Sequence, residues 1–292
     1  MAALGPDLRA DLQAAVLRKI THERMIAAAF PTVLVKALAT LRKPEFDMAE
    51  VARTLESDPV VALRCIRLVN SVALAAAQPA VSILQAVGRL GALRLRTLLL
   101  QIAAERVFAS QDPAINQACR TLWQHSVAVG LLTRELLAFG AIDDDAAEAG
   151  YLGGLLHDIG KPVVAGLLLD AERRLRGKAT QHWLNVDEWI EWINEVHRQA
   201  GLALAIKWEM PEVVSEAIRS SDQLDEAAPR SVTNFIVLAN DLAKREGLYL
   251  GPVDLDAISA RISAAKSLLA LPEGAIEQLT PGLRERVAER LT

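Results

Sequence analysis

The spacing of apolar residues along the chain predicts helices from one end to the other. Apolar positions recur at intervals of three and four residues, and no stretch shows the alternation and β-branched enrichment of a strand. Prolines, glycines and capping residues mark where the helices begin and end. The predicted helices are 6–29, 30–43, 47–56, one opening at 58–59, 82–91, 92–108, 113–139, one following 143–145, 163–175, one ending at 208, 211–221, 231–246, and a tail from 252 interrupted at 272 and 281. The pattern predicts an all-α protein.

Several polar residues are predicted to cap these helices. Asp58 precedes Pro59, which is the order of an N-cap followed by a proline in the first turn. Ser82 with Gln85 has the spacing of a capping box. The acidic run 143–145 precedes another helix, where negative charge interacts favourably with the helix dipole. We therefore interpret these three carboxylates as a cap and not as a metal site.

Charge and composition narrow the classes of function. Hydrophobic residues make up 52% of the 292 residues but aromatics only 4%, which favours helices packed through small and aliphatic side chains. The net charge of −4 and the pI near 5.8 argue against a dedicated nucleic-acid binder. Residues 47–70, with Arg64 and Arg67 on the second predicted helix, superficially resemble a helix-turn-helix, so DNA binding is kept as a minor alternative.

We expect a soluble cytoplasmic protein with no membrane partner. The N-terminus lacks the basic start and apolar core of a signal peptide. The longest uncharged run, Leu68–Gly88, is interrupted by several polar residues and by Pro79. Cys65 and Cys119 lie within apolar helical patterns, which indicates buried, reduced thiols.

The chemistry that the sequence suggests is concentrated in residues 151–162, which read YLGGLLHDIGKP. His157 and Asp158 together offer a nitrogen and an oxygen ligand for a divalent metal, and Lys161 could face a phosphate. Adjacent residues share no helix face, so both could reach one ion only near the end of a helix, which Gly160 and Pro162 indicate. The alternative is a helix-end pair that is hydrogen-bonded to the backbone.

The order of short motifs along the chain resembles one family, the HDOD domain, a bacterial relative of the HD-type phosphohydrolases. The motifs are Phe30-Pro31, Asp58-Pro59, Arg67-Leu68, Asn70-Ser71, Gln85-Ala86, Leu90-Gly91, Leu95-Arg96, Leu122–Ser126, Gly154–Lys161, His197, Gly201, Trp208, Pro211 and Ala217-Ile218. The resemblance covers roughly residues 25–250, an extent that a single motif does not reach by chance. It implies an N-terminal helical bundle packed against an HD-like helical bundle, with domains at 1–29 (extension), 30–110, 111–250 and 251–292 (tail).

The resemblance also implies a set of ligand residues. HD hydrolases hold a divalent metal with a first His, a His-Asp pair and a later Asp on a separate helix. His125 matches the first ligand, and His157 and Asp158 match the pair. The last position falls on Asn240 or Asp241, and the natural placement puts Asn240 there, a weaker ligand than a carboxylate. Lys161 matches a lysine that contacts phosphate in the cyclic-dinucleotide phosphodiesterases.

The sequence departs from the catalytic relatives in two places. Where a further His pair is usual, residues 217–222 read AIRSSD, and serines do not replace imidazoles as metal ligands. The glycine-tyrosine-proline loop of the phosphodiesterases is also absent. A two-metal hydrolase is therefore disfavoured, and at most a single divalent metal is expected. We interpret His197 as a residue that makes a buried hydrogen bond.

Functions from different classes remain open after these comparisons. The family is associated with bacterial signal transduction, mostly without demonstrated catalysis, which implies a non-catalytic protein that binds a signalling partner or a small ligand such as a nucleotide second messenger. The alternative is a metal-dependent phosphohydrolase acting on a nucleotide or cyclic dinucleotide. The amphipathic ends, 6–29 and 252–292, could also support a homodimer.

Overall fold

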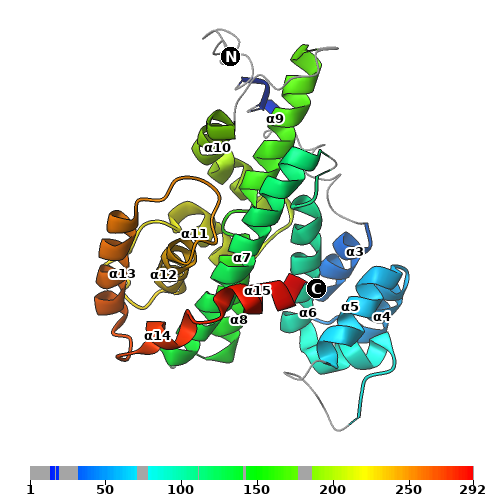
Figure 1. Ribbon diagram of the computed structural model, residues 1–292. Coiled ribbons are helices and arrows are strands. Elements are labelled where there is room, and N and C mark those ends of the chain that lie inside the picture. The colour runs from blue at the N-terminus through cyan, green and yellow to red at the C-terminus, as the bar shows by residue number, and fades with distance from the viewer. Residues whose placement is uncertain are drawn as a thin grey trace. The chain divides into compact units, whose positions relative to one another are not determined.

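The computed structural model describes residues 14–16, 18–19, 32–70, 78–110, 112–140, 143–176 and 186–291, and all regular secondary structure in these ranges is helical (Figure 1). The helices are α3 (Thr32–Leu41), α4 (Met48–Glu56), α5 (Pro59–Val69), α6 (Ile83–Val107), α7 (Pro113–Phe139), α8 (Asp144–Leu156), α9 (Gly160–Arg176), α10 (Val186–Lys207), α11 (Glu212–Ser220), α12 (Val232–Arg245), α13 (Leu255–Leu269), α14 (Ala275–Leu279) and α15 (Leu283–Leu291). The prediction of an all-α protein is confirmed. The predicted helix within 6–29 lies mostly outside the described residues.

The chain divides into two compact units, residues 27–106 and residues 107–292 with 1–26. In the smaller unit, Asp47 and Asp58 accept hydrogen bonds from the first backbone amides of α4 and α5, as N-caps do. Gly91, with φ 68° and ψ 174°, breaks α6 at the predicted end of the helix that begins near Ser82. Gln85 reaches back to the amide of Val81, one residue earlier than the capping box requires.

One of the two arginines that suggested DNA binding, Arg64, is already paired inside the smaller unit. Both terminal nitrogens of Arg64 on α5 bind the carboxylate of Glu105 on α6, one of them at 2.9 Å. This pairing neutralises a charge that a phosphate backbone would need. Ordinary packing of α5 on its neighbours therefore accounts for this arginine.

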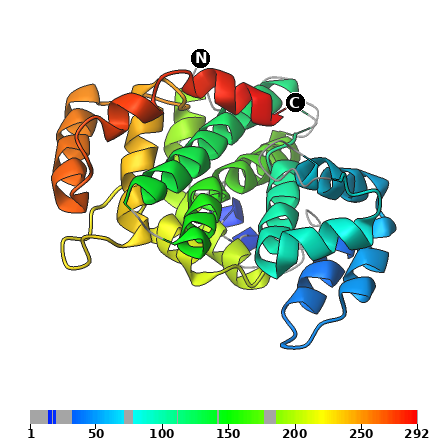
Figure 2. The ribbon, with the colours of Figure 1, turned by 90° about the horizontal axis from the view of Figure 1, so that it is seen from below.

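The larger unit is built around α7, against which α8 and α12 pack (Figures 1 and 2). Glycines make the contact between α7 and α8 close: a Cβ on Gly154 would lie 2.9 Å from Thr133 Oγ1 and 3.0 Å from the carbonyl of Val129. At the far side of the unit, Arg286 of α15 binds both carboxylate oxygens of Glu135 on α7, at 2.6 and 2.7 Å. The C-terminal helices are thereby joined to the central helix.

An apolar cluster lies where α9 packs on α10. It contains the buried side chains of Val164 and Leu168 from α9 and of Trp189, Trp192 and Ile193 from α10. The two helices approach most closely at Gly160, where a Cβ would lie 1.8 Å from the carbonyl oxygen of His197. No side chain fits between these backbones, so the glycine fixes the position of α10 beside the start of α9.

Burial explains the most apolar part of the chain. Among the described residues, one helical stretch, 144–174, is long and apolar enough to cross a bilayer by length and composition. Of its most apolar 18-residue part, 89% is buried inside the fold. The core helices of a folded protein have this property. The two cysteines are also free and buried, and burial raises the pKa of each thiol to about 11.

We predict that Gly160→Ala lowers the free energy of unfolding by roughly 1–3 kcal/mol or more, because the added methyl group must push α10 away from α9. Gly166→Ala is the control on the same helix, since nothing lies within 4 Å of its added Cβ; it should stabilise by about 0.4–1 kcal/mol. Urea denaturation of both variants tests this, and equal effects would contradict the close approach.

Candidate functional site

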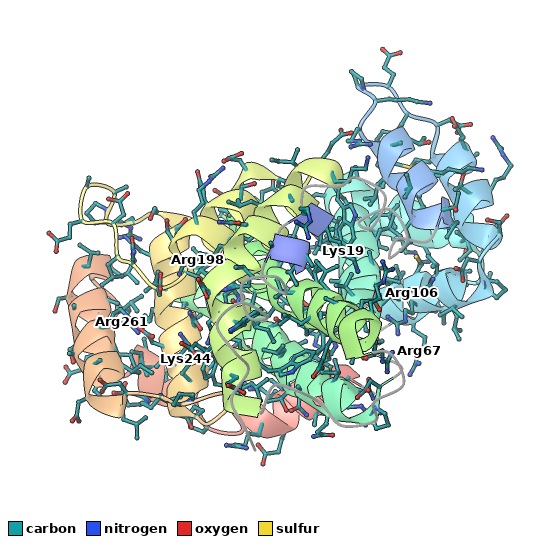
Figure 3. The ribbon with its side chains drawn as sticks, turned by 90° about the horizontal axis from the view of Figure 1, so that it is seen from above. Lys19, Arg67, Arg106, Arg198, Lys244 and Arg261 are labelled. Atoms are coloured by element: carbon teal, nitrogen blue, oxygen red, sulfur yellow. The ribbon has the colours of Figure 1, made fainter. Side chains whose placement is uncertain are left out.

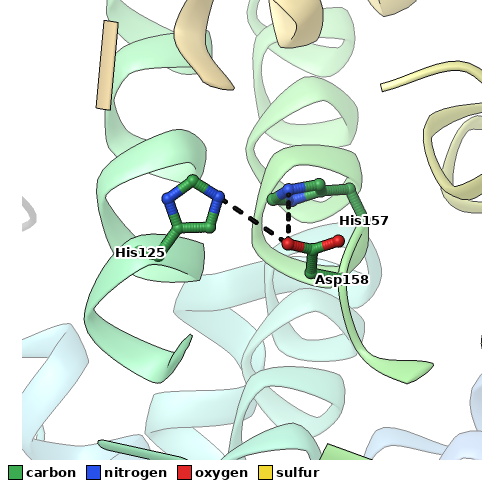
Figure 4. Close-up of side chains that lie close together, drawn as sticks. All are labelled: His125, His157 and Asp158. Atoms are coloured by element: carbon green, nitrogen blue, oxygen red, sulfur yellow. Dashed lines mark ion pairs between the residues drawn. The ribbon is translucent and has the colours of Figure 1, made fainter. Parts of the chain in front are cut away.

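Three side chains from different segments converge in the interior of the larger unit (Figure 4). His125 lies on α7, His157 is the C-cap residue of α8, and Asp158 follows in the turn before α9. Asp158 Oδ2 is 3.3 Å from His157 Nε2 and 3.7 Å from His125 Nε2. All three residues are at most 3% exposed. The turn after α8 allows both members of the His-Asp pair to reach one point, as the glycine and proline nearby predicted.

Backbone carbonyls fix the orientation of both imidazoles. His125 Nδ1 lies 2.7 Å from the carbonyl oxygen of Leu248, and His157 Nδ1 lies 2.7 Å from that of Gly154. Because a carbonyl only accepts hydrogen bonds, each Nδ1 carries a proton, and the neutral ring has its lone pair on Nε2. Neither Nε2 atom has a hydrogen-bond partner among the described residues. Outer hydrogen bonds of this kind orient histidines that bind metals.

The positively charged side chain of Lys161 lies beside the carboxylate of Asp158. Lys161 Nζ lies 2.6 Å from Asp158 Oδ2, and both side chains are buried. Burial alone would raise the pKa of Asp158, but His157 and Lys161 outweigh it and hold that pKa well below its usual value. Burial likewise opposes the charge of Lys161, yet Asp158 keeps the pKa of the lysine above normal. The two groups form a charged, buried ion pair.

The structure separates the two candidates for the last ligand. Asn240 lines the same cavity as Asp158: its amide nitrogen donates to the carbonyl of Ser221 at 2.8 Å, and its buried Oδ1 has no partner among the described residues. Asp241 is 1% exposed, and Arg261 of α13 binds both of its oxygens, at 2.5 and 2.7 Å. Consecutive helical residues point about 100° apart, so only one of them can face the centre. The structure brings Asn240 to the cavity and holds Asp241 in an ion pair with Arg261 instead.

A polar cavity of about 370 Å³ opens beside the three convergent residues. His197 of α10 lines it, with Nδ1 2.9 Å from the carbonyl of Asn194 and Nε2 3.6 Å from Asp158 Oδ1. The hydrogen bond agrees with the role predicted for this histidine. Burial lowers the pKa of His197, although Asp158 opposes the shift, so the ring is neutral at pH 7.

Lys244 of α12 and Tyr249 are among the cavity residues that were not anticipated from the sequence. The amine of Lys244 lies 5.1 Å from the ring centroid of Tyr249, and that of Lys161 lies 5.0 Å from the same centroid. Lys244 stands one helical turn after Asn240, and this spacing is the one signal that could have placed it on the same face. Burial, followed by the charge of Lys161, lowers the pKa of Lys244.

The donor set fits a single divalent ion in part. Two imidazole nitrogens, a carboxylate and an amide oxygen are chemically suitable, and three of these atoms lack a hydrogen-bond partner in the described structure. However, an ion at Asp158 would share that carboxylate with the ammonium group of Lys161, and the two positive charges repel. An ion bound at Asp158 Oδ2 would therefore lie beside the ammonium group of Lys161.

Comparisons with known proteins agree with this architecture. The HDOD domain family model matches residues 27–224. A solved structure from Shewanella amazonensis SB2B, named "Putative metal-dependent phosphohydrolase", aligns with a TM-score of 0.65 at 19% identity, covering 95% of this chain and 98% of that one. An HDOD domain protein of unknown function from Geobacter sulfurreducens aligns with a TM-score of 0.56 at 21% identity, covering 96% and 99%. These likenesses establish a shared fold.

A relative known from its sequence is longer than this chain. An uncharacterized protein of Treponema pallidum (strain Nichols) is 27% identical over 204 residues, which is 68% of this chain and 38% of that protein. The family match ends at residue 224, whereas Asn240, Lys244 and Tyr249 of the cavity lie beyond it. The part of the cavity that α12 supplies is therefore read from this structure alone.

We predict that Arg261→Met lowers the free energy of unfolding by roughly 1–3 kcal/mol, because it leaves the Asp241 carboxylate buried without its partner. Arg245→Met, on α12 and paired in the described structure with its partly exposed neighbour Glu246, is the control and should change stability by less than about 0.5 kcal/mol. Chemical denaturation measures both, and equal losses would contradict a structural role for Asp241.

Proposed function

Because the chain belongs to the HDOD domain family, we propose that it is a signalling protein that binds ligands or partners without turning them over. The observation that carries this proposal is the ion pair between Lys161 and Asp158. A catalytic HD centre uses its Asp to hold a metal. Here the ammonium group of Lys161 lies against Asp158 Oδ2, the carboxylate oxygen that is near the Nε2 atoms of both histidines. The family resemblance supports bacterial signal transduction in the cytoplasm, with a signalling protein or a nucleotide second messenger as the partner.

Two further features of the centre support a non-catalytic role. The last ligand position is Asn240, and a neutral amide binds divalent ions more weakly than a carboxylate. The position of the expected His pair holds Ser220 and Ser221, and the carbonyl of Ser221 binds the amide of Asn240. That hydrogen bond links the end of α11 to α12. It gives the segment with Ser220 and Ser221 a structural role instead of a role in a second metal site.

A second candidate function is a single-metal phosphohydrolase. It is favoured by the unpartnered Nε2 atoms of His125 and His157, whose orientation suits a metal ligand, and by the fold shared with the Shewanella protein. The residues that would hold the ion are His125, His157, Asp158 and Asn240. The ion would act as a Lewis acid toward a phosphoryl oxygen. On this alternative, Lys161 must release Asp158 before the ion binds.

We predict that wild-type protein purified without chelator carries no stoichiometric metal, and that millimolar Mn²⁺ does not raise its melting temperature. Lys161→Met should lower stability by roughly 3–5 kcal/mol, because Asp158 loses its partner. Mn²⁺ should then restore about 2.7 kcal/mol at a concentration 100 times its Kd. Metal analysis and thermal unfolding measure these effects.

The control for this prediction is Lys207→Met, which removes an exposed lysine from the last turn of α10. Mn²⁺ should leave its melting temperature unchanged, as in the wild type. One bound metal per wild-type chain, lost in His157→Ala, would contradict the proposal that Lys161 keeps the centre free of metal.

We also predict no hydrolysis of bis(p-nitrophenyl) phosphate or of a cyclic dinucleotide above the background of His157→Ala, with Mn²⁺ or Mg²⁺ added. The physical reason is that Lys161 lies against the carboxylate that would have to hold an ion able to polarise a phosphoryl oxygen. Turnover that Asp158→Asn abolishes, in protein whose fold is verified by circular dichroism, would establish the phosphohydrolase instead.

A further inference from the structure

Lys244 is a cation that faces the polar cavity and forms no ion pair with the carboxylates described there, Asp158, Glu195 and Asp222. Its side chain has no ion-pair or hydrogen-bond partner among the described residues, and its one specific contact is with the ring of Tyr249. The residue is only half-exposed, so water does not solvate the charge fully. A partly buried, unpaired charge is costly and indicates a missing counter-ion.

The neighbouring charges do not supply that counter-ion. Asp158 is bound to Lys161 at 2.6 Å. Asp222, which also lines the cavity, forms an ion pair with Arg198 of α10 at 2.7 Å. Figure 3 labels Arg198 and Lys244. Asp241, although near in sequence, is held by both nitrogens of Arg261. With each of these carboxylates bound to another cation, the amine of Lys244 remains available to an anion from outside.

We infer that Lys244 is the recognition residue of a site for a small phosphate-bearing molecule in this cavity, bound without a metal. The inference rests on the proposed function, since it names the ligand class of a binding protein. The amines of Lys244 and Lys161 lie 5.1 and 5.0 Å from the centroid of the Tyr249 ring. An anion bound beside Lys244 would therefore also be attracted, more weakly, by the ion-paired Lys161. His197 and Asn194 line the same cavity and add polar hydrogen-bonding groups.

The charges and the volume favour this ligand over other anions and over cations. Lysines bind phosphate as point charges, whereas carboxylates are most often recognised by the planar fork of an arginine. A volume of about 370 Å³ suits a small molecule of nucleotide size or less and is far too small for a macromolecule. Two lysine ammonium groups also repel a divalent cation at this point. The cavity is therefore suited to an anion whether or not a metal binds beside His125, His157 and Asp158.

The test is isothermal titration of the full chain with inorganic pyrophosphate in buffer containing EDTA. The proposal predicts binding that weakens roughly 10- to 100-fold in Lys244→Met, because one charge-assisted contact is lost. Lys244→Arg, which keeps the charge, should bind more tightly than Lys244→Met. The control Lys207→Met, exposed on α10, should bind like the wild type.

Three results would overturn the inference: no binding of pyrophosphate to the wild type, equal losses in Lys244→Met and Lys207→Met, or tighter binding of acetate than of pyrophosphate. Lys244 has no ion-pair partner to lose, so Lys244→Met should melt at or above the wild-type temperature, and this measurement shows that lost binding is not lost folding. The proposed function fails by a different result, metal-dependent turnover, which the EDTA in this titration excludes.

Discussion

An ammonium group 2.6 Å from a buried carboxylate decides what the centre of this protein can do. Asp158 is 3% exposed, and such a carboxylate stays ionised only beside a positive charge. In a metal centre that charge is the ion. Here Lys161, one turn further along the chain, places a positive charge beside Asp158. The unpartnered nitrogens of His125 and His157 retain the geometry of metal ligands around an oxygen that is already occupied.

The close packing of backbones holds this arrangement in place. Gly154 allows α8 to lie against α7, which brings His157 beside His125. Gly160 allows α9 to touch the backbone of α10 at His197, which places that imidazole over the other oxygen of Asp158. Gly154 and Gly160 thus determine where the imidazoles and the Asp158 carboxylate lie. Loss of either close contact would move the cavity wall as well as the helix.

Local signals predicted much of the fold because capping and helix ending depend on neighbours in the sequence. Asp58 caps α5, and α7 runs from Pro113 to Phe139 as its flanking residues predicted. The partners of charged side chains could not be predicted in this way. Whether Asn240 or Asp241 faces the centre depends on the rotation of α12 and on Arg261, twenty residues away. The contact of Lys161 with Asp158 likewise depends on burial that only the folded chain creates.

The most direct test of the account is the state of the two imidazoles when a metal is offered. Protein labelled with ¹⁵N at histidine can be titrated with Zn²⁺ while the Nε2 resonances of His125 and His157 are followed by NMR. We predict that both resonances remain at the position of an unligated imidazole in the wild type and shift together only in Lys161→Met. A joint shift of both resonances in the wild type at one equivalent of Zn²⁺ would contradict it.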